Sequence, residues 1–404
     1  MFHNVREMSR LLEAAKRDQA RSSDPYAPNR FYVDLYEAIQ DPSQRPDLKE
    51  IGRASIRRIF EAVVPDGRAI LESWRPGTPE SAQALLEGPN SIQTTDFSNI
   101  TGQLVFAAVL EAWEQPQFIG SELVTEKTTD MLDQELIPGI SGLGDMAETF
   151  GVVDEGESYP LAGVSEEYIT VPKKRKRGFI VPITKEAIIG DKTGLVIQRA
   201  SAVSESLALN KEKRILHTIL GLDTIYSRNG SVATATYADS GSAPHDFDNL
   251  NDNALNDETD IEVADQILNA IVDPNTGEPI VVSRPQLLVP QALRREAFRM
   301  LNATEVRETS GTTVTLAGKS LEQNIQMLTS PYVKVKTSSD TGWYYGDFKK
   351  AFAYYTVWPI TTEQAPANSE AEFRNDIVSR FKVSEMGTTA VEEPRYVYKS
   401  TGTA

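Results

Sequence analysis

The stretch that decides the fold lies in the middle of the chain and reads TGLVIQRASAVSESLALNKEKRILHTIL from Thr193 to Leu220. It contains no proline and a single glycine, Gly194, near its start. Apolar residues recur at helical spacing along one face: Val196, Ala200, Val203, Leu207, Ile215 and Ile219. A continuous helix of this length would measure about 40 Å, at a rise of about 1.5 Å per residue. We therefore expect a helix that spans a domain and ends at Gly221.

Acidic and basic residues are segregated into two neighbouring segments ahead of this helix. The basic run follows Pro172 and leads into a strand-like segment, GFIVPIT, at 178–184. The segregation predicts a long antiparallel hairpin over residues 151–184, with charge pairs between its limbs. The candidate residues are Asp154, Glu155, Glu157, Glu166 and Glu167 on the acidic limb, and Lys173, Lys174, Arg175, Lys176 and Arg177 in the basic run.

Two other interpretations of the basic run are a nuclear address and a nucleic-acid patch. The position of the run, between a proline and a strand and opposite an acidic limb, instead favours salt bridges at an interface. We therefore treat all ten charged residues as candidates for contacts between subunits.

Signals for helices and strands alternate between residues 259 and 340. Helices are predicted at 261–271, 291–301 and about 321–327, and strands at 286–289 and 332–336. Strand signals then dominate, at 343–345, 351–358 and about 373–391. An alternation of this kind is typical of an α/β or α+β core, and we predict the α+β class.

The first 150 residues are predicted to be mainly helical. Short amphipathic helices are expected up to about residue 75, followed by a linker rich in Pro, Gly, Ser and Thr at 76–98. A further helix is expected at 99–113. Residues 1–98 are thus a helical arm with a linker, and residues 99–150 are a helix and turn leading to the hairpin.

Composition excludes several classes of protein. The chain has 404 residues and a formal net charge of −17, which argues against tight phosphate binding over most of its surface. It has no cysteine, so disulfides, cysteine nucleophiles and thiolate metal sites are excluded. No run approaches the roughly 20 apolar residues of a membrane span, and the first residues lack the basic-then-apolar order of a secretion signal.

Candidates for catalysis are few. The histidines are His3, His217 and His245, and none has metal-binding partners at a recognisable spacing. Ser141 lies in a glycine-rich stretch, but Leu143 stands where a serine elbow needs its second glycine. We therefore predict no catalytic, cofactor-binding or metal-binding residue.

Two further patterns are interpreted as structural. The acidic loop at 246–252 lacks the glycine that an EF-hand loop needs, so we expect a surface loop. The aromatic residues between 343 and 358 could stack on bases, but at this density on strand-forming sequence we expect them to form core.

The order of parts from about Asn99 to Tyr398 resembles that of the major capsid proteins of tailed bacteriophages. That fold is shared with the herpesvirus capsid floor and with encapsulins. The segments that carry the resemblance are EGESYP (155–160), ITKEAI (183–188), ALNKEKRIL (208–216), WYYGDF (343–348), YYTVWP (354–359) and RNDIVSRF (374–381).

The resemblance implies a layout for the whole chain. It implies an N-terminal arm, an extended β-hairpin loop at 151–184 and a peripheral domain at 185–258 with residues 193–220 as its spine helix. It further implies an α/β axial domain at 259–340, and strands at 341–404 that close the axial and peripheral domains.

The function implied is that of a major head protein. Its copies would assemble into hexamers and pentamers of an icosahedral shell around a double-stranded DNA genome. Expected partners are further copies of the chain, portal, scaffolding and possibly decoration proteins, with only weak, non-specific DNA contact and no membrane. The chain would act in the virion after assembly in the host cytoplasm, without enzymatic activity or a cofactor. The alternatives are an encapsulin-type nanocompartment shell and, from another class, a serine hydrolase built around Ser141.

Overall fold

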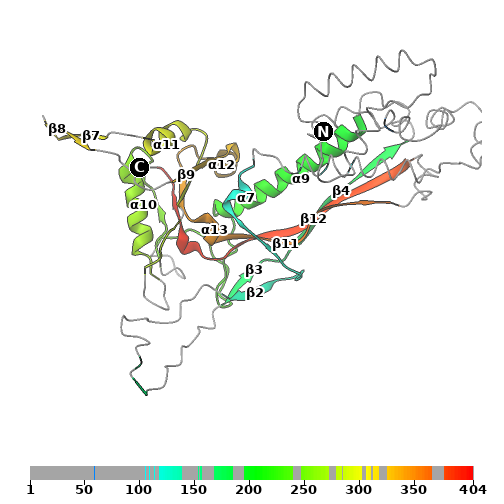
Figure 1. Ribbon diagram of the computed structural model, residues 1–404, viewed down its shortest axis with the longest axis horizontal. Helices are drawn as coiled ribbons and strands as arrows, with labels where there is room; N and C mark the ends of the chain where they lie inside the picture. The colour runs from blue at the N-terminus through cyan, green and yellow to red at the C-terminus, as the bar shows by residue number, and fades with distance from the viewer. Residues whose placement is uncertain are drawn as a thin grey trace, which may run out of the picture. The chain divides into compact units, whose positions relative to one another are not determined.

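The structure is a computed structural model (Figure 1). It describes residues 118–138, 168–184, 195–239, 247–272, 279–283, 285–302, 306–310, 313–317, 325–365 and 377–403, with single positions at 59, 105, 109, 113, 153, 155 and 156. The chain divides into two compact units. The first unit comprises Met1–Gln115, Lys176–Leu209 and Pro359–Glu385, and the second comprises Pro116–Arg175, Asn210–Trp358 and Met386–Ala404.

A five-stranded sheet forms the centre of the second unit. Its strands are β5 (Leu250–Asn251), β13 (Val397–Ser400), β10 (Trp343–Gly346), β6 (Gln286–Val289) and β9 (Gln326–Thr329), in that order across the sheet. β10 pairs antiparallel with both β13 and β6, whereas β6–β9 and β13–β5 are parallel pairs. The sheet is therefore mixed.

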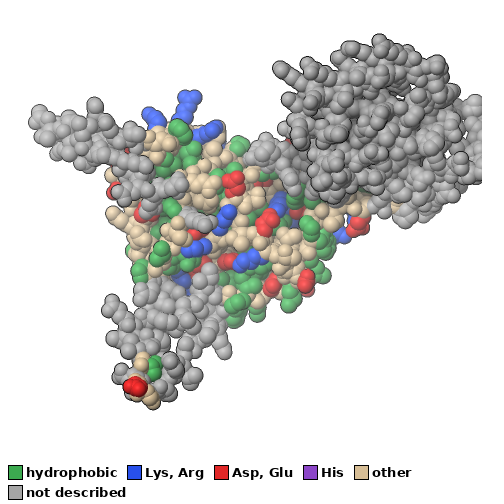
Figure 2. Space-filling view, viewed as in Figure 1, with side chains coloured by type: hydrophobic (Ala, Val, Ile, Leu, Met, Phe, Trp, Pro, Cys, Tyr) green, Lys and Arg blue, Asp and Glu red, His purple; other side chains and the backbone are tan. Residues whose placement is uncertain are grey.

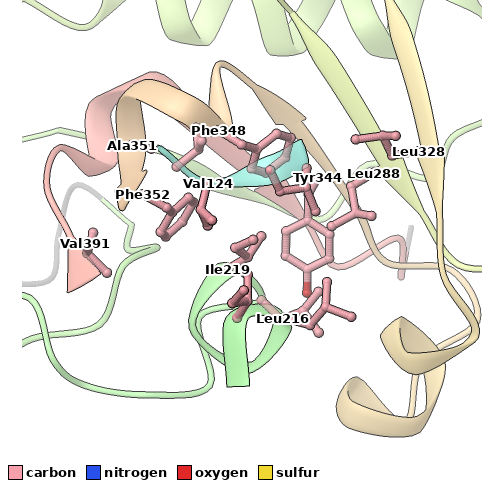
Figure 3. Close-up of a cluster of buried hydrophobic side chains, with 14 of the residues drawn as sticks. Val124, Leu216, Ile219, Leu288, Leu328, Tyr344, Phe348, Ala351, Phe352 and Val391 are labelled. Carbon is pink, nitrogen blue, oxygen red and sulfur yellow. The ribbon is translucent and has the colours of Figure 1, made fainter. Parts of the chain in front are cut away.

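The two faces of this sheet pack in two separate hydrophobic cores, because successive residues of a strand point to opposite faces. Trp343 and Tyr345 pack with α10 (Glu258–Ala270) and α11 (Arg294–Leu301) on one face. Tyr344 packs on the other face, with the C-terminal end of α9 (Leu195–Ile219). Figure 3 shows the second cluster, in which Tyr344, Leu288 and Leu216 converge.

Three short helices complete the second core. They are α7 (Gly120–Leu123), α12 (Pro331–Thr337) and α13 (Phe348–Ala351), and they bury Leu123, Val333 and Phe348. The N-terminus of α7 has no cap from its own residues. The carboxylate of Glu212 on α9 supplies one, because it accepts backbone hydrogen bonds from Gly120 at 2.7 Å and Ile119 at 3.2 Å. Such a carboxylate also complements the positive end of the helix dipole.

Two long strands run through both units. β11 (Phe352–Gln364) and β12 (Ile377–Val391) are the central strands of a sheet ordered β1-β11-β12-β4. β1 (Thr125–Thr128) pairs parallel with the start of β11, and β4 comprises Arg175–Thr184. Within the first unit β4 and β12 approach closely: a Cβ atom on Gly178 would lie 2.4 Å from the Val383 carbonyl oxygen.

Two small antiparallel sheets remain. β2 (Glu135–Pro138) pairs with β3 (Tyr168–Val171), and β7 (Val306–Ser310) pairs with β8 (Thr313–Ala317). The β2–β3 pair packs on β11 and β12 through Ile137, Val171, Tyr355 and Ala390. In the first unit, the helical positions Val105 and Val109 are buried, and Ser204 on α9 donates a 2.6 Å hydrogen bond to the Val109 carbonyl oxygen.

Most of the predicted elements are confirmed. The long helix forms as α9, the helices at 261–271 and 291–301 as α10 and α11, and the strands at 286–289, 343–345 and 351–358 as β6, β10 and β11. The strand predicted from about 373 forms as β12 over its described part. The α+β class is confirmed, and the aromatic residues from Trp343 to Tyr355 are buried.

Three local predictions are wrong. Residues 332–336 form helix α12 instead of a strand. The helix predicted at about 321–327 gives way to strand β9 at Gln326, and residues 321–324 lie outside the described residues. The strand at 168–171 does not pair with the strand at 178–184, because β3 pairs with β2 and β4 neighbours β12.

Candidate functional site

The basic run, singled out as a candidate interface, lies between two strands and continues into the second of them. Lys173 and Lys174 connect β3 to β4, and Arg175, Lys176 and Arg177 are the first residues of β4. Neighbouring residues of an extended chain point to opposite sides. The five side chains are therefore unequal: Lys173, Arg175 and Lys176 are exposed, Arg177 is half-buried and Lys174 is fully buried.

Lys174 is held by residues just before and at the start of β2. Its Nζ lies 2.6 Å from Glu135 Oε2 and donates to the Asp133 carbonyl oxygen at 3.2 Å. The same ammonium lies 5.8 Å from the centre of the Tyr355 ring on β11. Glu135 also accepts a hydrogen bond from Thr129 Oγ1 at 2.8 Å. We call Lys174, Glu135, Thr129 and the Asp133 carbonyl the Lys174 anchor.

A second ion pair, between Lys127 and Glu392, also contacts Tyr355. The Tyr355 hydroxyl donates to Glu392 Oε1 at 2.6 Å, and Lys127 Nζ lies 2.5 Å from the same oxygen. Lys127 also lies 5.9 Å from the centre of the Tyr355 ring. One aromatic residue on β11 thus contacts two lysines, each paired with its own glutamate, so the β2–β3 pair is tied to β1, β11 and the end of β12.

The pKa values in this network follow its contacts. Burial acts to raise the pKa of Glu135, but the hydrogen bonds from Lys174 and Thr129 outweigh it, so the pKa lies below its ordinary value. Burial, and then the bond to Glu392, raise the pKa of the Tyr355 hydroxyl well above its ordinary value. At neutral pH Glu135 is therefore ionised and Tyr355 remains a hydrogen-bond donor.

Lys173 forms a different kind of contact. Its Nζ lies 2.5 Å from Asp133 Oδ1, with 68% and 78% of the two side chains exposed. The hydrogen bond from Lys173 lowers the pKa of Asp133. Exposed pairs of this kind contribute about 0–1 kcal/mol. Lys173 is therefore still accessible to another molecule.

The carboxylates that the sequence assigned to the basic run are not those that Lys173 and Lys174 contact. Of the acidic limb, Glu155 is described and lies exposed in a turn, whereas Asp154, Glu157, Glu166 and Glu167 lie outside the described residues. The observed partners, Asp133 and Glu135, precede the acidic limb in the chain. They were missed because the pairing of β2 with β3 is not visible in either segment alone.

The pairing of β2 with β3 also changes the bounds of the loop that the sequence predicted at 151–184. Pro138 is the register partner of Tyr168, so the segment 139–167 begins and ends at one paired position. The Lys174 anchor lies at the other end of this four-residue ladder, where Glu135 is the register partner of Val171, and it ties the start of β2 to the residues that follow β3. The β2–β3 pairing and the Lys174 anchor thus fix the two strands that flank residues 139–167.

The other residues considered for chemistry have structural contacts or lie outside the described residues. His217 Nε2 lies 3.0 Å from Asp223 Oδ1 on the surface of α9, while His3, Ser141 and His245 lie outside the described residues. In the loop at 246–252, the buried Asn249 amide donates to the Thr236, Pro394 and Val397 carbonyl oxygens. Within the described ranges, no three His, Asp or Glu side chains are placed to hold a metal ion. No helix in the described part of the chain is both long and apolar enough to cross a membrane.

Comparisons with known proteins give one family. Residues 167–400 match the model of a family described as phage capsid protein. No curated protein matches the chain in sequence.

Several solved structures are similar to this chain at low sequence identity. The capsid of cyanophage Pam1 is 11% identical, with a TM-score of 0.44 over 72% of this chain and 92% of the other. The capsid of a native GTA particle is 10% identical, with a TM-score of 0.41 over 70% and 89%. A virus-like particle from Pyrococcus furiosus is 10% identical, with a TM-score of 0.37 over 74% and 99%.

The family assignment rests on the sequence match, which covers more than half of the chain. It begins one residue before β3 and ends with β13, and so includes Lys174, Tyr355 and Glu392. This chain belongs to the phage capsid protein family.

Proposed function

We propose that copies of this chain form rings of six and five that tile an icosahedral head around double-stranded DNA. The observation that carries this function is the family match over residues 167–400. A shell subunit has to repeat one set of contacts, and heterologous contacts that close produce rings. The same match favours a phage head over the nanocompartment shell.

The proposed contact uses the part of the chain next to the Lys174 anchor. The segment 139–167 leaves and re-enters the fold at one pinned position, so it can extend onto a neighbouring copy while its ends stay fixed. Lys173, Arg175 and Lys176 are exposed close in sequence to the Lys174 anchor, at the other end of the β2–β3 ladder. Lys174, buried within its own subunit, positions this segment and is not itself a contact.

The remaining expectations follow from the same role. A head subunit would meet portal, scaffolding and decoration proteins during assembly in the host cytoplasm. Its contact with packaged DNA would be weak, since the chain carries a net charge of −17. The chain would have no catalytic activity of its own.

Electron microscopy and sedimentation of the purified full-length chain test this function. We expect rings or closed shells of megadalton size, formed by the chain alone or with a scaffolding protein. A species that stays monomeric at high concentration under both conditions would contradict the proposal. Replacing Ser141 by alanine should leave particle yield unchanged, and a hydrolytic activity that disappears with Ser141→Ala would favour the hydrolase instead.

A further inference from the structure

Charge is distributed unevenly within the second unit. Between residues 229 and 283 there is no lysine or arginine, and there are 11 carboxylates: Asp239, Asp246, Asp248, Asp252, Asp257, Glu258, Asp260, Glu262, Asp265, Asp273 and Glu278. The following helix, α11, has the sequence RREAFRML, with three arginines and one glutamate. An acidic segment is therefore followed by a basic helix in the same unit.

Helix α10 presents part of the acidic charge at the surface. Its inner face buries Ile261, Ala264 and Leu268. The side chains of Asp257 and Asp260 already accept backbone hydrogen bonds, because they form a capping box at the N-terminus of α10. Glu258 and Glu262 take no part in that cap. They stand four residues apart, on neighbouring turns, and neither forms an ion pair with another described residue.

Helix α11 presents the opposite charge. Its inner face buries Ala297 and Met300. Arg294, Arg295 and Arg299 are exposed, as is Phe298, with 59% of its surface accessible. Figure 2 shows the basic side chains gathered over α11 at the edge of the molecule. The exposed side of α11 thus carries Phe298, three arginines and one carboxylate, that of Glu296, which lies 4.0 Å from Arg299.

Arg294 and Arg295 are unfavourably placed within their own chain. They occupy the first turn of α11, where the helix dipole disfavours positive charge, and the N-cap residue Leu293 offers no side-chain hydrogen bond. No carboxylate lies within ion-pair distance of either one in the part of the chain that the structure describes. The two arginines therefore suit an anionic partner.

The two helices cover different parts of one sheet face. Both pack against Trp343 and Tyr345, but α10 contacts β13 and α11 contacts β9. In the order β5-β13-β10-β6-β9, β9 is one edge strand and β13 lies next to the other edge. The acidic and basic surfaces therefore lie toward opposite edges of the sheet, as a head-to-tail contact requires.

We propose that the outer face of α11 in one copy docks on the outer face of α10 in the next copy around a ring. Arg294 and Arg295 would pair with Glu258 and Glu262 of the neighbour, and Phe298 would be covered by the contact. Because each copy carries both surfaces, the contact is heterologous, and it produces a ring when the rotation between neighbours closes. The inference rests on the proposed self-assembly and adds the surface that joins neighbours.

Reversal of the two arginines is the first test. Glutamate is favoured in the first turn of a helix, so the variant R294E/R295E should fold at least as well as the wild type by circular dichroism. We expect it to lose rings and shells in electron microscopy. The matched control is K336E/K349E, which makes the same change in net charge on two other helices of the same unit and should still assemble.

Rescue is the second test. The variant E258K/E262K should also fail to assemble alone, because it places lysines against the arginines of the next copy. A chain that carries both pairs of reversals should assemble again. A mixture of the two single-surface variants should form rings with an even number of copies, since matching contacts then require alternation around the ring.

The results of these variants distinguish three explanations. Normal particles from R294E/R295E, or failure of the combined variant to assemble while it stays folded, would overturn the α10–α11 contact. If the wild type forms no particle at all, the proposed function itself fails. If R294E/R295E forms normal particles that retain less duplex DNA, measured by nuclease protection, the face binds nucleic acid and the contact is excluded.

Discussion

At the scale of single residues, Lys173 and Lys174 are adjacent but have opposite roles. The Lys173 side chain is 68% exposed and its ion pair with Asp133 faces solvent, whereas the Lys174 side chain is fully buried against Glu135. A buried charge that loses its partner remains desolvated and uncompensated, which is far more costly than the loss of a solvated pair. Sequence alone cannot distinguish the two lysines, since the difference arises from the strand that packs on them.

Replacing Lys174 by methionine should therefore destabilise the subunit by about 1–3 kcal/mol, because Glu135, whose side chain is 20% exposed, would lose its cation and a hydrogen-bond donor while staying partly shielded from water. Lys173→Met removes only an exposed pair and should cost about 0–1 kcal/mol. Urea unfolding of the unassembled subunit measures both. The double variant K174M/E135L should recover much of the loss, since a well-packed apolar pair can replace a buried ion pair. Equal losses from Lys173→Met and Lys174→Met would contradict the anchor.

Glu212, which caps α7 from α9, should give the opposite pH dependence from Glu135. Burial raises the pKa of Glu212 above its ordinary value of 4.5, despite the hydrogen bonds from Gly120 and Ile119 that act to lower it. The folded state therefore holds this proton more tightly than the unfolded state does. Its contribution to stability is fully present below about pH 4.5 and is lost as the pH rises through the folded-state pKa.

The variant Glu212→Gln removes this titration and keeps one acceptor for the α7 N-terminus. The difference in unfolding free energy between wild type and variant should therefore move against the wild type as the pH rises from about 4 to 7. Urea unfolding of the unassembled subunit at several pH values measures it. Glu135→Gln is the matched comparison: the pKa of Glu135 is lowered, so the wild type should gain on this variant as the pH rises toward about 4.5 and the difference should then stay level at higher pH. A constant difference for Glu212→Gln would exclude the raised pKa.

At the scale of elements, helix α12 shows how a local pattern can mislead. Residues 332–336 read YVKVK, and this alternation of apolar and charged residues predicts a half-buried strand. The structure buries Val333 and leaves Val335 68% exposed. The residues before the segment decide the outcome: Ser330 caps the helix and Pro331 is favoured in its first turn. The helix-start residues Ser330 and Pro331 therefore outweighed the strand-like alternation of the five residues that follow.

Ser330→Ala tests this explanation. The Ser330 hydroxyl accepts a hydrogen bond from the Tyr332 backbone N–H at 3.3 Å. Loss of such a cap costs about 0.5–2 kcal/mol, whereas glycine at the same position costs only a few tenths. We expect Ser330→Ala to lower the unfolding free energy of the subunit by that amount, and Ser330→Gly to lower it less. If Ser330→Ala changes nothing, Pro331 and packing of Val333 suffice to hold α12.

The same scale shows how much of the fold and the site the sequence could predict. Long periodic segments such as α9 and β11 are predicted correctly, because one face of each is apolar over many residues. The partner of β3 is predicted wrongly, because charge complementarity between adjacent segments says nothing about strands farther away. β2 is separated from β3 by residues 139–167. The basic run could therefore be recognised as a site, but Asp133, Glu135 and Tyr355 could not be assigned to it.

At the scale of the whole molecule, a net charge of −17 opposes association of identical copies. Assembly then depends on basic surface that meets the acidic surface of a neighbour. Among the described residues, basic groups that could serve in this way include Lys173, Arg175 and Lys176, close in sequence to the Lys174 anchor, and the outer face of α11. Charge pairs at the surface are screened over about 8–10 Å near physiological ionic strength, so formation of particles should be sensitive to salt.

Reversal of Lys173, Arg175 and Lys176 to glutamate should block assembly and leave the subunit folded. Each exposed pair is worth only about 0–1 kcal/mol, so no single change should matter much. A contact repeated between all neighbours of a shell multiplies the small term, and the triple reversal turns attraction into repulsion at every copy. Lys174 is left unchanged, so the Lys174 anchor remains intact.

Circular dichroism checks folding and electron microscopy counts shells in this experiment. A control with reversals at Lys334, Lys336 and Lys349 makes the same change in net charge on α12 and α13, and it should assemble. If the variant reversed at Lys173, Arg175 and Lys176 still forms normal shells, these three residues are a solvated surface. If both triple variants fail to assemble, net repulsion accounts for the loss. If only the variant reversed at Lys173, Arg175 and Lys176 fails to assemble, contact through these residues is essential. Raising the salt concentration should then partly reproduce the same loss of shells in the wild type.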